Sequence, residues 1–585
     1  MLRATPWIDH PLEDADLLHL ILLQSGLEFD YDAQRPNPDR AALRLLHSTA
    51  THLIDSLCTK YRDARRSGDM MLRIDPADVA SRAAAAMRSL GPLQNVQLEG
   101  LDDDALATVL AEAGRVAHDR QRLAASRRGA DRRGLETLCL QRGQFTGSCL
   151  FTCDPRLEVA LPERSPIAAD VASPPASPSA APRLLPRLLE LDLGGCGQLT
   201  DAGLEALTAE TPLLARFRIT VNAQLRRPRL SLPWLRSATL AICTNLDDEA
   251  VSALCAGSPL LRELSLWRCT SLHAPALDAR NLQVLNLCEC AELNDGALVH
   301  VAKNGARLSS LLLAGCEALS GSTPHWGGGP SLTTLDVSEL PSISDAQLSM
   351  ACASSPELVR LDCSRSGPGV RAPVLGGAKL RALVCTKCES LVDEAVSGAC
   401  DRSPVLGSLM LALCVTLFSP RIHGENLAEI TLSGCNMLQD AAVTHASMHC
   451  PRLAKLSLSL CAALVEPYVA GPMLRRVVLS HAEQLSRPTI GGPALEELTL
   501  TGCTRMEDTP LEQACAGSPR LRTLKISGCV KLQHARLASG SLRTLECDYV
   551  AREVVDHAAD RLRCPLLSSI GCEAYVDPEG FEEVD

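Results

Sequence analysis

The sequence has few aromatic residues, no excess of positive charge and no long apolar run. Aromatic residues make up only 3% of a chain whose hydrophobic residues reach 46%, so its core must be assembled from many aliphatic side chains. A net charge of -12 argues against a nucleic-acid partner, and few aromatic rings are available to stack on bases. Without an apolar stretch of about 18 residues, no membrane-spanning helix is predicted.

A targeting signal is not expected either. Met1 to His10 are not basic and are not followed by a clean apolar signal core. We therefore expect an intracellular, soluble protein, located in the cytoplasm, the nucleus or both. The 26 cysteines are expected to stay reduced, because disulfide frameworks are typical of small secreted domains and this chain is long.

The common catalytic motifs are missing as well. There is no G-x-x-x-x-G-K-[ST] loop for phosphate, no G-x-S-x-G elbow and no H-E-x-x-H, and the 14 histidines show no metal-ligand spacing. Cys385 and Cys388 form a C-x-x-C, but no second ligand pair follows at the spacing of a zinc site. We predict no catalytic residue, no cofactor and no metal site, so the chain is not expected to be an enzyme.

One apolar pattern, L-x-x-L-x-L-x-x-C, recurs along most of the chain. Clear copies begin at Leu188, Leu261, Leu282, Leu308, Leu406, Leu427, Leu453, Leu495 and Leu521. Their spacing alternates between about 26 and about 21 residues, which is the signature of leucine-rich repeats. The pattern predicts an α/β fold: a ribonuclease-inhibitor-like horseshoe solenoid over residues 135–585, with a disordered insertion rich in Pro, Ala and Ser at 160–187.

Two kinds of repeat alternate. Long repeats carry an aspartate before a helical pattern, which suits a helix start and its dipole: Asp201, Asp248, Asp295, Asp345, Asp393, Asp440 and Asp508. Short repeats place proline where that helix would grow: Pro228, Pro275, Pro420, Pro467 and Pro488. Because proline opposes helix formation, we expect extended chain there. We interpret the aspartates as helix caps, and the cysteine that ends most repeats as a small buried side chain that meets the backbone of a neighbouring coil.

The repeats LLELDLGGCGQLTDAGLEAL (188–207) and LAEITLSGCNMLQDAAV (427–443) resemble those of F-box/leucine-rich-repeat proteins, above all plant and algal members. The resemblance implies a receptor that presents substrates to an SCF-type cullin-RING ubiquitin ligase. An F-box would lie in the basic helical segment 96–134, where the best candidate for the adaptor contact is the apolar set Leu101, Leu106, Val109 and Leu110. The usual proline and tryptophan are absent, and a helix that caps the open end of the solenoid is the alternative.

Residues 1–95 carry no repeats and are predicted to be all-α, with helices near 14–25, 39–66 and 76–89. The middle helix is amphipathic, and the third begins with Asp75 at the N-cap and Pro76 in the first turn. The order of a short helix, a long helix and an I-D-x-x-D-V start resembles histone-fold subunits of general transcription factors. Such subunits pair as heterodimers, which implies a histone-fold partner. A plain three-helix module remains the other interpretation.

The concave side of such a solenoid is formed by the residues between and beside the strand leucines. Most of them are small, but the middle repeats present an aromatic residue among mixed charges, which is typical of an interaction hot spot. The candidate partner-binding residues are Trp267, Arg268, Glu289, Asp336, Arg360, Asp362, Arg365 and Lys387. We expect a protein target there, whose identity the sequence does not specify.

Overall fold

The computed structural model describes residues 71–74, 95–99, 137–142, 145, 185, 187–320, 329–560, 562–572, 574–577 and 580–583. The predicted amino-terminal helices, the candidate adaptor contact at Leu101, Leu106, Val109 and Leu110, and nearly all of the insertion at 160–187 lie outside these residues. The described residues belong to two compact units, Met1–Leu261 and Arg262–Asp585.

The first unit is built on parallel strands that pair in chain order. They are β1 (Met71–Ile74), β2 (Asn95–Glu99), β3 (Thr137–Gln141), β4 (Glu190–Gly194), β5 (Arg216–Thr220) and β6 (Ser237–Ala241), with the helices α5 (Asp201–Ala209) and α6 (Asp248–Gly257). The sheet thus begins before residue 135, inside the region predicted to be all-α. Strands of four or five residues without a closing cysteine give little sequence signal, so the repeat pattern did not reveal β1 and β2.

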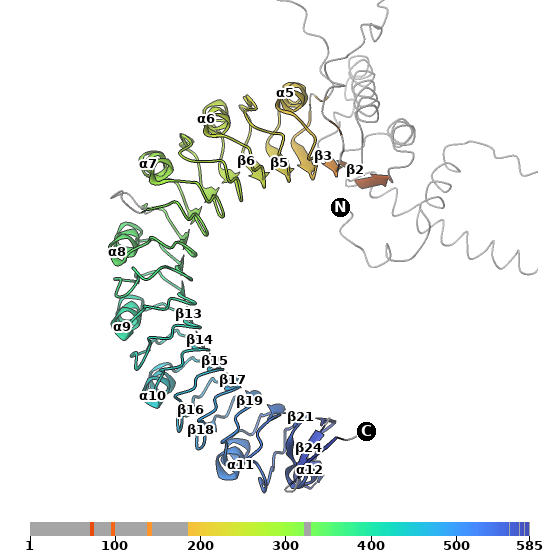
Figure 1. The fold of residues 1–585 in the computed structure, drawn as a ribbon, viewed down its shortest axis with the longest axis vertical. Coiled ribbons are helices and arrows are strands. Elements are labelled where there is room, and N and C mark those ends of the chain that lie inside the picture. The colour runs from red at the N-terminus through yellow and green to blue at the C-terminus, as the bar shows by residue number, and fades with distance from the viewer. Residues whose placement is uncertain are drawn as a thin grey trace, which may run out of the picture. The chain divides into compact units, whose positions relative to one another are not determined.

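The second unit continues the same kind of coil. Its inner strands are β7 (Glu263–Ser265), β8 (Val284–Asn286), β9 (Ser310–Leu312), β10 (Thr334–Asp336), β11 (Arg360–Asp362), β12 (Ala382–Val384), β13 (Ser408–Met410), β14 (Glu429–Thr431), β15 (Lys455–Ser457), β17 (Arg476–Val478), β19 (Glu497–Thr499), β20 (Thr523–Lys525), β21 (Thr544–Glu546) and β23 (Ser569–Gly571). Each pairs in parallel with the next inner strand. Within this unit the strands line the inside of a curve and the helices lie outside (Figure 1).

The second unit also contains the remaining elements. They are α7 (Asp295–Asn304), α8 (Asp345–Ser354), α9 (Asp393–Arg402), α10 (Asp440–His449), α11 (Asp508–Ala516), α12 (Arg552–Ala559), β16 (Tyr468–Ala470), β18 (Thr489–Gly491), β22 (Val550–Ala551), β24 (Ala574–Asp577) and β25 (Gly580–Glu583). Helices follow the long repeats and extended chain follows the short ones, so the predicted leucine-rich-repeat solenoid is confirmed. Where two short repeats are adjacent, their outer segments pair as β16 and β18.

The strand pattern explains where the core lies. In β7 the central Leu264 is buried, and so is Leu266, which follows the strand, whereas Ser265 between them is half-buried on the other face. The same alternation holds coil after coil, because successive side chains of a strand point to opposite faces. The core is therefore a continuous column of leucines enclosed between the inner strands and the outer helices.

Five of the seven aspartates predicted as helix caps act differently. The N-cap of α5 is Thr200, whose side chain accepts a hydrogen bond from Gly203 N, and Asp201 is the first helical residue. Its carboxylate accepts bonds from the backbone N–H groups of Arg226 at 2.9 Å and Arg227 at 2.8 Å, in the following short coil. Asp345, Asp393, Asp440 and Asp508 do the same. These aspartates are clamps between coils, because the extended short coil leaves two N–H groups free beside the helix start.

The clamp predicts a loss of stability on substitution. Asp393 accepts from Phe418 N at 2.9 Å and from Ser419 N at 2.7 Å. We expect Asp393→Ala to lower the free energy of unfolding by about 2 kcal/mol, because two charge-assisted hydrogen bonds are lost. Glu394→Ala is the matched control, since this exposed acid lies in the same first turn and should cost less than about 0.5 kcal/mol. Urea denaturation measures both, and equal losses would refute the clamp.

The cysteine that ends most repeats is structural, as predicted. Its thiol donates a hydrogen bond to a carbonyl of the preceding coil, as in Cys435 Sγ to Leu411 O at 3.2 Å and Cys461 Sγ to Leu432 O at 3.1 Å. We call these residues the thiol ladder: Cys196, Cys290, Cys316, Cys388, Cys414, Cys435, Cys461, Cys503 and Cys529. In the C-x-x-C, Cys388 belongs to the ladder and Cys385 is buried directly after strand β12.

Candidate functional site

The residue just before the position that ends each repeat, where the ladder cysteines lie, has a left-handed backbone. In the second unit these residues have φ between +53° and +77°, and we call them the left-handed column: Arg268, Glu289, Gly315, Glu339, Arg365, Lys387, Leu413, Gly434, Leu460, His481, Gly502, Gly528 and Tyr549. In this conformation the backbone N–H group of the residue donates a hydrogen bond to the following coil. Lys387 N donates to Ala412 O, and Leu413 N donates to Ser433 O, each at 2.7 Å. The chain then turns so that the next residue points into the core.

Glycine adopts this conformation freely, whereas a residue with a Cβ pays about 1–2 kcal/mol. Four coils of the second unit have glycine in the column, so the coil itself does not require a side chain there. The other positions carry side chains that are exposed to solvent, including Arg268, Lys387 and Leu460. Strain retained at exposed positions indicates a role for these side chains outside the core.

The first predicted site residues meet across two neighbouring coils. Trp267 is half-buried in the turn after β7, and its indole Nε1 donates to Glu289 Oε1 at 3.0 Å. The other carboxylate oxygen of Glu289 lies 3.6 Å from Nε of Arg268. We call these three residues the Trp267 cluster. One carboxylate thus fixes an aromatic ring and a guanidinium side by side at the surface.

A second group lies on the inner face of the sheet. Asp336 in β10 and Asp362 in β11 are direct cross-strand partners, and Arg360 Nη2 lies 3.5 Å from Asp362 Oδ2. Asp336 accepts hydrogen bonds from the backbone N–H of Ser338 at 3.0 Å and from its hydroxyl at 2.7 Å. Burial raises the pKa of Asp362, while its bonds to Ser364 act in the opposite direction. We call Asp336, Arg360 and Asp362 the Asp362 cluster.

The remaining predicted residues lie in the left-handed column. Arg365 Nη1 pairs with Glu339 Oε1 at 2.5 Å, and Lys387 follows in the next coil. Glu339 was missed, because its repeat ends in Leu340 and so did not match the cysteine pattern. Lys387 is exposed and forms no ion pair with a residue that the structure describes. The predicted residues therefore lie on the inner face of the sheet, in the left-handed column beside it and, for Trp267, in the turn after β7.

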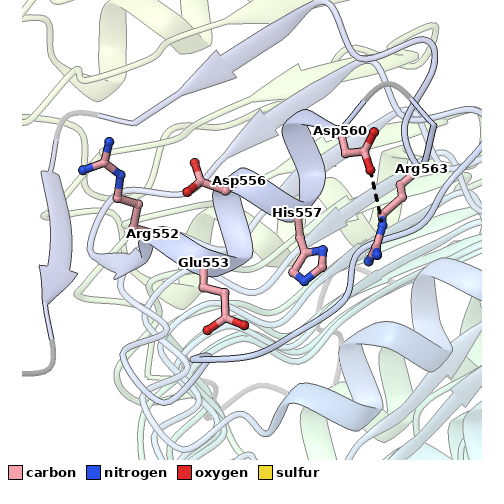
Figure 2. A pocket seen from close by; sticks show the side chains of 6 residues that line it. All are labelled: Arg552, Glu553, Asp556, His557, Asp560 and Arg563. Atoms are coloured by element: carbon pink, nitrogen blue, oxygen red, sulfur yellow. Dashed lines mark ion pairs between the residues drawn. The ribbon is translucent and has the colours of Figure 1, made fainter.

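A different surface feature lies at α12. A hollow of about 450 Å³ is lined by the charged side chains in Figure 2, namely Arg552, Glu553, Asp556, His557, Asp560 and Arg563. Asp560 and Arg563 form an ion pair at 3.6 Å. Ligand pockets are mostly apolar with a few polar groups, and this hollow has charged walls of both signs. We assign no ligand to it.

None of the helices in the described part of the chain is long and apolar enough to cross a membrane. Among the same residues, no group of three or more His, Cys, Asp or Glu side chains is arranged to hold a metal ion.

No protein-family model and no curated protein sequence matches the chain. Among solved structures, it is similar to a chain of the yeast Rad7–Elc1 complex, with 12% identity, 84% of this chain and 94% of that chain covered, and a TM-score of 0.24. A chain of the mouse RP105/MD-1 complex is 13% identical, with coverage of 82% and 76% and a TM-score of 0.37. The functional domain of InlJ from Listeria monocytogenes, which includes a cysteine ladder, is 14% identical, with coverage of 79% and 71% and a TM-score of 0.30. The fold assignment rests on the strands and coils described above.

Proposed function

We propose that the chain is a non-catalytic scaffold that binds a protein target through the Trp267 cluster, the Asp362 cluster and the Glu339–Arg365 pair. One observation carries this proposal: bulky charged side chains occupy left-handed positions where neighbouring coils have glycine. Exposure to solvent does not offset the conformational energy of the left-handed backbone, whereas contacts with a partner do. An aromatic residue and arginines held in place by carboxylates are also the side chains that dominate binding energy in protein interfaces.

The finer proposal is that this scaffold is the substrate-recognition subunit of an SCF-type cullin-RING ubiquitin ligase. It is supported by the cysteine-ending repeats that resemble those of F-box proteins, and its adaptor contact would be Leu101, Leu106, Val109 and Leu110. The alternative is an interaction protein linked to transcription, in which residues 1–95 pair with a histone-fold partner. Either role places the protein in the cytoplasm or the nucleus.

Affinity purification of the intact chain tests the two roles. We expect the cullin adaptor to be recovered together with a protein target. Recovery of transcription-factor subunits without the adaptor would replace the ligase role by the alternative.

The same purification tests the binding face. We expect the double variant Trp267→Ala with Arg365→Ala to reduce target recovery at least about tenfold, because truncation of an interface hot spot costs about 1 kcal/mol or more. Adaptor recovery should not change. The matched control is Trp234→Ala with Arg371→Ala, since Trp234 is 53% exposed in the first unit and Arg371 is exposed in a short outer segment. If the first variant retains its target like the control, the binding face is assigned to the wrong residues.

A further inference from the structure

Two histidines lie on the carboxyl-terminal half of α10, on the outer side of the second unit (Figure 1). His445 is half-buried and His449, the last helical residue, is exposed. Residues four apart lie on the same face of a helix. The two imidazole rings are stacked, with centroids 4.1 Å apart and planes inclined by 16°. The spacing of four residues between His445 and His449 was missed in the sequence, although a helix was predicted to follow Asp440.

The hydrogen bonds of the two rings define which nitrogen carries the proton. His445 Nδ1 lies 3.0 Å from Ile422 O, and His449 Nδ1 lies 2.9 Å from His445 O. A carbonyl oxygen can only accept, so Nδ1 is the donor in both rings. In the neutral imidazole this leaves Nε2 with a free lone pair. Metal-binding histidines commonly use this arrangement, in which a backbone carbonyl fixes the ring and its tautomer.

One metal ion needs the two Nε2 atoms close together. A tetrahedral ion with two nitrogen ligands at about 2.0–2.1 Å holds those nitrogens roughly 3.3 Å apart. In the stack the ring centroids are 4.1 Å apart and the planes are inclined by only 16°, so the exposed His449 ring has to rotate out of the stack before both in-plane lone pairs can point at one ion. A cation there also lies near the carboxyl-terminal, negative end of the α10 dipole. The spacing of four residues on one helix face and the field of the helix thus favour a positively charged ligand.

The neighbouring His423 is not part of the ligand pair. Its ring packs edge-on against His445 with centroids 6.3 Å apart, and both of its nitrogens face oxygens. Nδ1 lies 3.2 Å from Arg421 O, and Nε2 lies 3.2 Å from Asp401 Oδ1. His423 therefore has no free nitrogen directed at the stacked pair.

We propose that His445 and His449 form an open site for one divalent transition-metal ion, with water in the remaining coordination positions. Two ligands agree with the finding that the described residues contain no preformed group of three. Imidazole nitrogen suits Zn²⁺, Cu²⁺ and Ni²⁺, whereas thiolates prefer Zn²⁺ and Cu⁺. Ni²⁺ is thus the suitable probe in this cysteine-rich chain. Binding links two turns of α10 and should stabilise that helix.

The test is calorimetric titration of the full chain, without a histidine tag and with its thiols reduced, with Ni²⁺ alone. We expect one ion per chain and at least a tenfold rise in Kd for His449→Ala and for His445→Gln, because one of two ligands is lost. Hydrogen exchange should show α10 amides slowed by Ni²⁺ in the wild type and not in these variants.

Two further variants complete the test. His300→Ala is the matched control, since this histidine of the outer helix α7 faces Asp278 at 3.2 Å, and it should bind Ni²⁺ like the wild type. His423→Ala should also keep binding. Absence of Ni²⁺ binding by the wild type, wild-type affinity in His449→Ala or His445→Gln, or loss of binding in His423→Ala would each overturn the two-histidine site.

Discussion

Gly367→Ala is expected to lower the free energy of unfolding by about 3 kcal/mol or more, although it adds a single methyl group to a half-exposed position. A Cβ built at Gly367 would overlap the carbonyl oxygen of Pro341 and lie 2.7 Å from its carbonyl carbon. Both atoms are backbone, so no side chain can move aside. The coil that contains Gly367 would have to separate from the preceding coil, which also breaks the bond from Gly367 N to Leu340 O at 3.2 Å.

Gly377→Ala is the matched control from the same coil. Nothing lies within 4 Å of a Cβ built at Gly377, so the alanine should leave stability within about 1 kcal/mol of the wild type or raise it slightly, because it restricts the unfolded chain. Urea denaturation compares the two variants. Repeat arrays need not unfold in one step, so hydrogen exchange should localise the loss to the coils around Pro341 and Gly367. Equal stability of both variants would contradict the close approach.

The sequence predicted the coil pattern well because that pattern is local. Each L-x-L triplet places leucines on one face of a strand, and a helical pattern or a proline within the same repeat decides whether a helix or an extended segment follows. The solenoid, the alternation of long and short coils and the structural role of the cysteines were therefore predictable. The strands β1 and β2 were not, since they carry no closing cysteine.

What could not be predicted depends on contacts between coils. The carboxylate of Asp393 looks like a helix cap in the sequence, and only the position of the next coil shows that it holds Phe418 N and Ser419 N. The left-handed column could not be predicted either, because Arg and Leu, as at Arg268 and Leu413, are residue types that rarely adopt a positive φ. For the candidate site, the sequence identified the charged and aromatic residues. It could not show that Glu289 joins Trp267 to Arg268.

The largest loss of stability is expected from removal of three consecutive members of the thiol ladder. In the triple variant Cys414→Ala, Cys435→Ala and Cys461→Ala, the free energy of unfolding should fall by roughly 3–6 kcal/mol, from a lost hydrogen bond and a small cavity at each site. The acceptors are buried carbonyls, such as Cys385 O at 2.9 Å from Cys414 Sγ. Cys288→Ala is the control, since its half-buried thiol lies outside the ladder, and it should cost less than about 1 kcal/mol.

Because of the same thiols, the free energy of unfolding is expected to fall at alkaline pH. Burial raises the pKa of Cys435 to about 11 and that of Cys461 to about 12, from an ordinary value of 9.0. Above pH 9 the unfolded chain loses these protons while the folded chain keeps them, so stability present below pH 9 is lost as the pH rises toward 11–12. Between pH 8 and 10.5, the unfolding free energy of the wild type should fall more steeply than that of the triple variant. Parallel curves would contradict a buried ladder of protonated thiols.

In the first unit, an asparagine occupies the position that a ladder cysteine has in other repeats. It suggests a variant that tests whether the ladder contributes to stability through its hydrogen bonds or through the volume of its side chains. Asn222 donates to Cys196 O at 2.7 Å and Leu199 O at 3.0 Å, and its side-chain oxygen accepts from two backbone N–H groups of its own turn. If the ladder is needed for its hydrogen bonds, Cys435→Asn should retain at least about 1 kcal/mol more stability than Cys435→Ala, because the amide replaces the lost donor. If the larger asparagine is instead the less stable variant, the coil selects cysteine for its size and the thiol bond contributes little.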